Sequence, residues 1–137
     1  MSDNKVSLIV ANEVPDNWFP RMFTAFGKTF FEVRVKRNNF IYNWIYILAM
    51  PDQAKNYFYH ALVENTSGEK ILTFYGQARS MFENPDEIIA NEDCFVFGVT
   101  TAKKLADKIT NQLGYRVKIR NLKDEAKDDS DESGIDD

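Results

Sequence analysis

The sequence contains one histidine and one cysteine, two side chains that can combine as a nucleophile and its base. His60 and Cys94 form such a pair only if the fold brings them together. Both lie within apolar runs, residues 58–62 (FYHAL) and 94–97 (CFVF), so we expect them to be buried and structural. One residue of each kind also falls short of the about four Cys or His ligands of a structural zinc site. We therefore expect no catalytic centre, no metal and no cofactor.

A second group with chemical potential is a basic strip over residues 103–123. It holds one acidic residue, Asp107, and seven basic residues: Lys103, Lys104, Lys108, Arg116, Lys118, Arg120 and Lys123. Such a strip is typical of a nucleic-acid-binding surface. The acidic isoelectric point of about 5.1 argues against that role, and solvated helix and strand faces are the simpler interpretation. Nucleic-acid binding stays as an alternative.

Charge divides the 137 residues into two parts. Residues 124–137 contain eight acidic residues and one lysine, whereas residues 1–123 contain 13 acidic and 16 basic residues and every aromatic side chain. We expect a folded domain over 1–123 and a disordered acidic tail over 124–137. Ser130, in the run DDSDE, is a candidate phosphorylation site for an acid-directed kinase, although a solubilising tail with an unmodified serine is the simpler interpretation.

Several classes of protein are excluded by composition. A single cysteine cannot form an internal disulfide, which excludes a disulfide-stapled secreted domain. No apolar run approaches the roughly 20 residues of a membrane-spanning helix. The first five residues, MSDNK, are too polar for a signal peptide. The expected location is the cytoplasm or the nucleus, with no membrane partner.

The elements that would position these residues are mostly strands, because apolar and polar residues alternate along much of the chain. Strands are expected over residues 5–11, 30–37, 43–50, 56–64, 70–75, 94–97 and 115–120, with a turn at Asn38-Asn39. In strand 30–37, the apolar residues Phe31, Val33 and Val35 are expected to face the core. The alternate residues Glu32, Arg34 and Lys36 are then expected to face solvent.

Two short helices complete the prediction. One follows Pro85, and the other is capped by Thr100 or Thr101 and continues to about Ile109, which faces inward. The fold class is therefore all-β: an antiparallel β-sandwich of about seven or eight strands with two short helices.

The first strand suggests a binding site. A strand at the edge of a sheet has unpaired backbone groups that can take up an extended peptide as an additional strand. The residues that follow, 17–22 (NWFPRM), place large apolar groups in a stretch rich in turn residues. These side chains either form a pocket beside that strand or close one end of the sandwich.

Five collinear segments resemble the substrate-binding domain of the seven-in-absentia (Siah) ubiquitin ligases, which has a TRAF-like fold. They are Asn17-Trp18 followed by Phe26-Gly27; residues 52–59 (DQAKNYFY); residues 72–80 (LTFYGQARS); residues 91–106, with NEDCFVF and TTAKKLA; and residues 113–119 (LGYRVKI). The resemblance extends over about residues 5–122, which is the whole predicted domain.

The resemblance implies a TRAF-like sandwich that usually dimerises and that binds a Val-x-Pro peptide along its first strand. Carried over residue by residue, that peptide groove is lined by Lys5, Ser7, Ile9, Asn17, Trp18 and Pro20. Trp18 matches the family. An acidic residue is replaced by Lys5, a valine by Ser7, an aspartate by Asn17 and a methionine by Pro20, so the peptide bound here is expected to differ or to be absent.

Ligases of this family also carry a RING and two zinc fingers ahead of this domain, all built on cysteine and histidine. With one of each, this chain is expected to recognise proteins without transferring ubiquitin itself. The resemblance implies a non-enzymatic adaptor or modulator of ubiquitin-dependent degradation. Its expected partners are extended peptides, a second copy of the chain or a Siah-type ligase.

Overall fold

The computed structural model describes residues 4–10, 20–65, 67, 69, 71–110 and 112–123, and for residues 4–10 only the backbone is described. These ranges form nine strands and three short helices. In chain order they are β1 (Asn4–Val10), β2 (Arg21–Ala25), β3 (Lys28–Arg37), β4 (Phe40–Ile47), α1 (Pro51–Ala54), β5 (Tyr57–Glu64), β6 (Ile71–Gln77), β7 (Arg79–Ser80), α2 (Pro85–Ala90), β8 (Phe95–Gly98), α3 (Val99–Leu105) and β9 (Gln112–Asn121).

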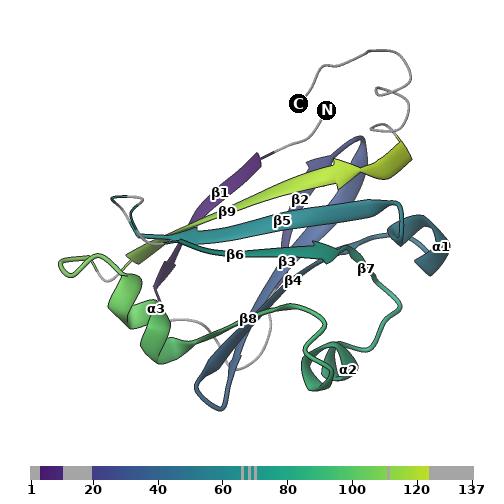
Figure 1. Ribbon diagram of the computed structural model, residues 1–137. Helices are drawn as coiled ribbons and strands as arrows, with labels where there is room; N and C mark the ends of the chain where they lie inside the picture. The colour runs from purple at the N-terminus through teal and green to yellow at the C-terminus, as the bar shows by residue number, and fades with distance from the viewer. Residues whose placement is uncertain are drawn as a thin grey trace.

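The strands form two sheets that face each other, as the ribbon shows (Figure 1). Sheet A has the order β1-β9-β5-β6 and is antiparallel throughout. Sheet B has the order β2-β3-β4-β7, and β8 also pairs with β4; only the two-residue β7 runs parallel to its neighbour. The predicted all-β antiparallel sandwich is therefore confirmed.

The main core lies between the sheets and is built from one parity of each strand. Along β5 the burial alternates, with Tyr57, Tyr59, Ala61 and Val63 facing inward. Along β9, Leu113, Tyr115, Val117 and Ile119 do the same. Phe30 packs edge-on against Tyr57 with ring centroids 5.4 Å apart, which joins the sheets at one end of the sandwich.

A second, smaller core lies on the outer side of sheet B. Val33, Val35 and Trp44 point away from the sandwich interior and pack against Ile88 of α2 and against Cys94. Strands β3 and β4 are therefore covered on both faces, which explains why residues 41–47 are almost wholly apolar. Asn84 caps α2 by accepting a hydrogen bond from the Asp86 backbone N–H at 2.9 Å, as expected for a helix that begins at Pro85.

Two-residue turns set the hairpins of sheet B. Asn38 and Asn39 join β3 to β4 with φ values of 52° and 69°, which confirms the predicted turn. Asparagine tolerates this left-handed conformation, and two such residues suit a tight hairpin. Phe26 and Gly27 join β2 to β3 in the same way, with φ values of 53° and 71°.

The structure corrects the helix that was predicted to begin at Thr100 or Thr101. Helix α3 begins at Val99, and its N-cap, Gly98, makes no side-chain cap hydrogen bond. The Val99 N–H instead donates to the Asn39 carbonyl at 2.9 Å, which ties the helix start to the β3–β4 turn. The helix ends at Leu105, and the side chain of Ile109, expected inside, is 94% exposed.

Three elements were not predicted. Residues 21–25 form β2, although the turn residues before them favoured a loop; they pair with residues 28–32 across the Phe26-Gly27 turn. The single-turn helix α1 occupies the Pro51-Asp52 interruption. The short strand β7 extends sheet B beside Tyr46 and Ile47. The predicted acidic tail, residues 124–137, lies outside the described residues.

Candidate functional site: the edge of strand β1

Strand β1 is an edge strand of sheet A, and this is the element for which peptide binding was predicted. Within the described ranges it pairs only with β9, so the backbone groups on its other side face no strand. The edge of sheet B on the same side of the sandwich is formed by β2 (Figure 1). Because β2 pairs only with residues 28–32 of β3, residues 33–37 of β3 also have a strand on one side only.

Three of the six predicted groove residues lie on β1. Lys5, Ser7 and Ile9 are paired with Val117, Tyr115 and Leu113, which are the inward-facing residues of β9. Pro20 is exposed and directly precedes β2. Asn17 and Trp18 lie outside the described residues, so the groove as a whole remains a prediction.

A buried polar cluster occupies the interior of the sandwich beside this edge. It consists of Glu32 and Arg34 of β3, Asn43 of β4 and Tyr115 of β9, and Tyr115 is the residue paired with Ser7 of β1. Glu32 is 2% exposed and Arg34 is 8% exposed. The cluster therefore places an ion pair between two sheets that are otherwise packed through apolar side chains.

The geometry of the buried polar cluster provides the Glu32 carboxylate with hydrogen-bond donors and a cation. Oε2 of Glu32 accepts hydrogen bonds from Nε of Arg34 at 2.7 Å and from Nδ2 of Asn43 at 2.8 Å. Asn43 also donates to the Val33 carbonyl at 2.9 Å, and its Oδ1 accepts from the Tyr115 hydroxyl at 2.9 Å. The Arg34 guanidinium carbon lies 4.8 Å from the centre of the Tyr115 ring, within range of a cation–π contact.

Burial, and next the nearby Glu32 carboxylate, raise the pKa of Tyr115 well above its ordinary value. The Tyr115 hydroxyl therefore stays protonated and remains a hydrogen-bond donor to Asn43 at any pH the protein meets. A donor fixed in this way links sheet A to sheet B directly beside β1. The cluster therefore fixes the position of β9, the strand beside β1, relative to strands β3 and β4 of the facing sheet.

This arrangement overturns the predicted orientation of β3. Glu32 and Arg34 face the interior, and Val33 and Val35 face outward. Alternation predicts the strand correctly but places its apolar residues in the wrong layer, because α2 provides a second apolar surface outside sheet B. The sequence feature that marks the cluster is Asn43, a polar residue within the apolar run 41–47.

The outer face of sheet A carries part of the predicted basic strip. Arg116, Lys118 and Arg120 are the exposed residues of β9, while Lys103 and Lys104 belong to α3 and Lys108 follows it. The seven basic residues of the strip therefore lie on separate elements. We call the outer side of β9, β5 and β6 the cationic face.

His60 and Cys94 do not form a catalytic pair. Tyr59 lies in the main core, so its neighbour His60 points to the outer side of sheet A, where it stacks on Tyr75 with ring centroids 4.1 Å apart. Cys94 packs in the second core, on the outer side of sheet B. Burial, with the Asp93 and Glu92 carboxylates nearby, raises the pKa of the Cys94 thiol to about 12.

Among the described residues no group of three or more His, Cys, Asp and Glu side chains is arranged to hold a metal ion. None of the helices described is long and apolar enough to cross a membrane.

Comparison with known proteins decides the family. The model of the family described as "Sina, TRAF-like domain" matches residues 23–118. The chain belongs to the Sina TRAF-like family. None of the curated proteins matches it. The matched range begins within β2 and ends within β9, and so covers the sandwich apart from β1.

Membership of the Sina TRAF-like family makes this region a Siah-like substrate-binding domain, which binds proteins and is not itself catalytic. Within the match lie all four residues of the buried polar cluster and the whole of β5 and β6. The six predicted groove residues lie before residue 23, outside the matched range.

We predict that Arg34→Met destabilises the protein strongly, because it leaves the Glu32 carboxylate buried without its cation. The expected loss in the free energy of unfolding is about 3–5 kcal/mol. The double variant Glu32→Gln/Arg34→Met removes both charges and should recover much of that loss. Chemical denaturation measures each value.

The matched control is Arg37→Met on the same strand. Arg37 pairs with Asp86 at 3.4 Å on the exposed surface, and such a pair contributes less than about 1 kcal/mol. If the two single variants lose the same stability, the cluster has no special role. If the double variant is no more stable than Arg34→Met, the unpaired carboxylate is not the cause.

We predict that the Cys94 thiol is inert in the native protein, because it is 2% exposed and is protonated near neutral pH. Iodoacetamide at pH 8 should label Cys94 only in denaturant, as followed by mass spectrometry. Rapid labelling of the folded protein would contradict this prediction and revive the idea of a nucleophile.

Proposed function

We propose that the protein is a non-catalytic substrate-recognition or adaptor domain in ubiquitin-dependent degradation, acting in the cytoplasm, the nucleus or both. In this proposal an extended peptide is added as a strand along β1. The single observation that carries it is the edge of β1, which among the described residues pairs only with β9, in a domain of the Sina TRAF-like family.

Strand addition suits this edge for a physical reason. Backbone hydrogen bonds supply affinity, and alternate side chains of the peptide supply specificity. If strand β1 is already held rigidly before the peptide binds, the binding free energy is not reduced by the cost of ordering the strand. The buried polar cluster supports this rigidity, because Tyr115 fixes β9, the strand on which β1 is paired, to sheet B.

The peptide class follows from the family and from the departures of this chain. The resemblance implies a Val-x-Pro peptide in a groove lined by Lys5, Ser7, Ile9, Asn17, Trp18 and Pro20. Lys5 stands where the family has an acidic residue. We infer that the bound peptide carries an acidic residue at that position, because a lysine there would repel a basic one.

Ubiquitin transfer is assigned to a partner in this proposal. These 137 residues hold one cysteine and one histidine, too few for the zinc sites of a RING. The domain would pair with a second copy or with a Siah-type ligase, which supplies the catalytic machinery. In such a complex the domain would either bring its own substrate to the ligase or keep the ligase from binding a substrate.

The alternative is a divergent scaffold or nucleic-acid-associated factor that uses the basic residues of 103–123. It has weaker support. These residues lie on α3, on the segment after it and on β9, and do not form the single strip that the sequence suggested. The net charge of −4 also opposes polyanion binding by the chain as a whole.

We predict that a peptide containing Val-x-Pro and an acidic residue binds the full chain, as measured by isothermal titration calorimetry. N-methylation of alternate peptide residues tests the mode. In an added strand, one set of alternate N–H groups faces β1 and the other faces solvent. Methylating the first set should weaken binding about tenfold or more, since each lost hydrogen bond contributes ~1 kcal/mol.

The peptide methylated on the other set is the matched control, and its affinity should stay within about twofold of the parent, a difference of under ~0.5 kcal/mol. Trp18→Ala should weaken binding of the parent peptide, because Trp18 is the groove residue that matches the family. Absence of binding, or equal loss from both methylated peptides, would refute strand addition along β1.

We predict that the full chain is a dimer in solution. Light scattering should give a mass of twice 15.9 kDa, and the chain should retain a Siah-type ligase in a pull-down of purified proteins. A monomer mass together with no retention of the ligase would contradict both dimerisation and ligase binding. Peptide binding along β1 is tested separately by the titration.

A further inference from the structure

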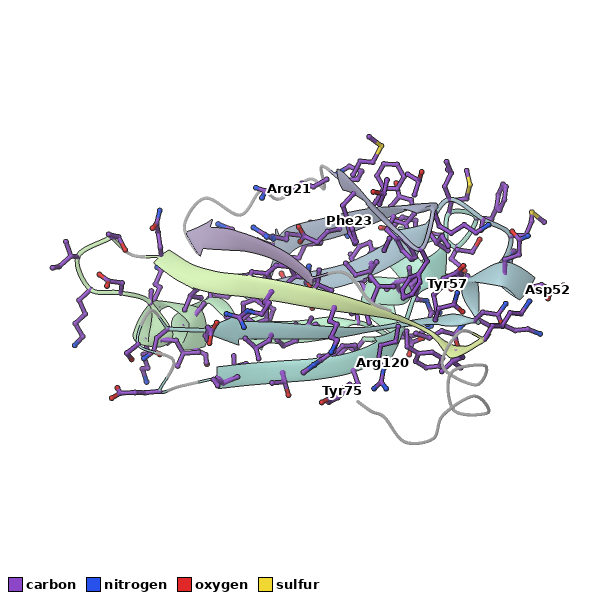
Figure 2. All side chains as sticks on the ribbon, turned by 90° about the horizontal axis from the view of Figure 1, so that it is seen from above. Arg21, Phe23, Asp52, Tyr57, Tyr75 and Arg120 are labelled. Carbon is purple, nitrogen blue, oxygen red and sulfur yellow. The ribbon has the colours of Figure 1, made fainter. Side chains whose placement is uncertain are left out.

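The cationic face is a charged sheet surface with no layer packed over it among the described elements. The β9 residues Arg116, Lys118 and Arg120 lie across from Leu62, His60 and Phe58 of β5. In Figure 2 the side chains of Arg120 and Tyr75 both point outward from this sheet, away from sheet B. Sheet B differs, because α2 covers its outer side.

Charge on the cationic face is strongly unbalanced. The outward positions of β9, β5 and β6 hold three cations and one carboxylate, Glu64, which accepts a hydrogen bond from Arg116 at 3.1 Å. Burial first, and then Lys118 and Arg120, lower the pKa of His60. The surroundings of His60 therefore resist a further positive charge, as expected for a surface of positive potential.

Aromatic side chains accompany these cations. Tyr75 is 67% exposed and stacks on His60, which lies between it and Lys118 across the sheet. Nε2 of His60 is shielded from solvent and has no hydrogen-bond partner among the described residues. The face therefore combines positive charge with one exposed ring and suits an extended acidic segment.

We propose that the acidic segment 124–137 of this chain folds back onto the cationic face and lies along Arg116, Lys118 and Arg120. This segment carries eight acidic residues and one lysine. It is the most concentrated negative charge in the sequence, and only Leu122 and Lys123 separate it from the strand that bears the three cations.

The point of attachment favours this occupant. The chain is held in place after β9 by two hydrogen bonds, from the Leu122 N–H to the Asn56 carbonyl at 2.8 Å and from the Lys123 N–H to the Asn121 side chain at 3.0 Å. Residue 124 therefore starts at the end of β9 nearest Arg120.

The segment is also long enough. Its 14 residues reach up to about 46 Å when extended. The distance along β9 from Arg116 to Arg120 is only about 14 Å. A short tether also gives an effective concentration in the millimolar range, so even weak pairwise attractions would hold the segment on the face.

The tethered segment would compete with any other polyanion for this face, including nucleic acid. It also gives Ser130 a defined role, because a phosphate there adds about 1.5–2 negative charges. Phosphorylation of Ser130 would therefore tighten the contact.

His60 provides a unique reporter, since it is the only histidine in the chain. Its ring is titrated by NMR in the full chain and in a variant with all eight acidic residues of 124–137 changed to Asn or Gln. The groups that face it, Lys118, Arg120, Tyr75, Arg116 and Glu64, are the same in both proteins. We expect a lower titration midpoint in the neutral variant, because negative charge near His60 favours its protonated form.

Salt separates this effect from a change in structure. At about 1 M salt the Debye length is about 3 Å, and the two midpoints should coincide. Equal midpoints at low salt would overturn the proposal. A difference that persists at high salt would also overturn it, because the contact would not be electrostatic.

A second measurement locates the segment directly. A nitroxide on Ser133→Cys should broaden the amide signals of residues 116–120 much more than those of residues 33–35 on sheet B, which lies about 10 Å farther away. The added thiol is labelled selectively if Cys94 is inert in the native state. Lys118→Glu/Arg120→Glu should abolish the broadening.

The matched control is Lys103→Glu/Lys104→Glu, which makes the same change in net charge on α3. Broadening lost equally in both double variants would show a general charge effect and refute docking on the cationic face. All measurements use the full chain without peptide, so they are independent of peptide binding at β1.

Discussion

The carboxylate of Glu32 is the constraint on which the rest of the sandwich depends. A charge buried to this extent must be neutralised and hydrogen-bonded, and Arg34 and Asn43 do both through the same oxygen atom. These partners lie on β3 and β4 in the pairing Arg34–Asn43. Glu32 and Arg34 lie on the same strand, so a slip between β3 and β4 leaves the ion pair intact, but a one-residue slip of β4 would turn Asn43 to the other face. The hydrogen bond from Asn43 therefore adds to the register that the apolar faces of these strands already specify.

The same constraint passes to the other sheet through one hydrogen bond. Asn43 accepts from the Tyr115 hydroxyl, and Tyr115 lies on β9, which pairs on one side with β5 and on the other with β1. Apolar packing between the sheets is non-directional, whereas this bond requires one relative position of β4 and β9. The position of the β1 edge relative to sheet B therefore depends on a side chain in the middle of the fold.

Much of this architecture could be predicted because local rules dominate it. Alternation along residues 56–64 and 115–120 predicted strands, and the structure has β5 and β9 there, each with one parity buried. Asn38-Asn39 gave the hairpin turn, because few residues other than glycine adopt positive φ at low cost. The collinear resemblance gave the family, which the match over residues 23–118 shows. For the strands and the turn, a few neighbouring residues determine the outcome, and for the family it is the order of several short segments along the chain.

What could not be predicted depends on contacts distant in sequence. The direction in which β3 faces is decided by α2, about fifty residues later, which offers Val33 and Val35 an apolar surface outside the sandwich. The start of α3 is decided by the Asn39 carbonyl, which no local capping rule includes. At the candidate site, the sequence predicts that β1 is an edge strand but does not predict the buried polar cluster beside it, because the four residues of the cluster come from three strands and only Asn43 interrupts an apolar pattern.

Strand β9 brings together the two surfaces for which we propose partners. Its inward residues carry Tyr115, its exposed side carries the cations, and its edge holds β1. The inward-facing side chains of β9 are packed in the core, so β9 has one conformation only. A segment bound on the cationic face is therefore not expected to change peptide binding at β1 through a conformational change. Coupling through charge is a different matter. A peptide strand added to β1 lies two strand spacings from β9, about 10 Å, which is close to the Debye length of about 8 Å at physiological salt and far below the about 30 Å at 0.01 M. An acidic segment on the cationic face would therefore lower the affinity of β1 for acidic peptides and spare neutral ones, so that occupancy of one surface tunes the specificity of the other without moving the backbone.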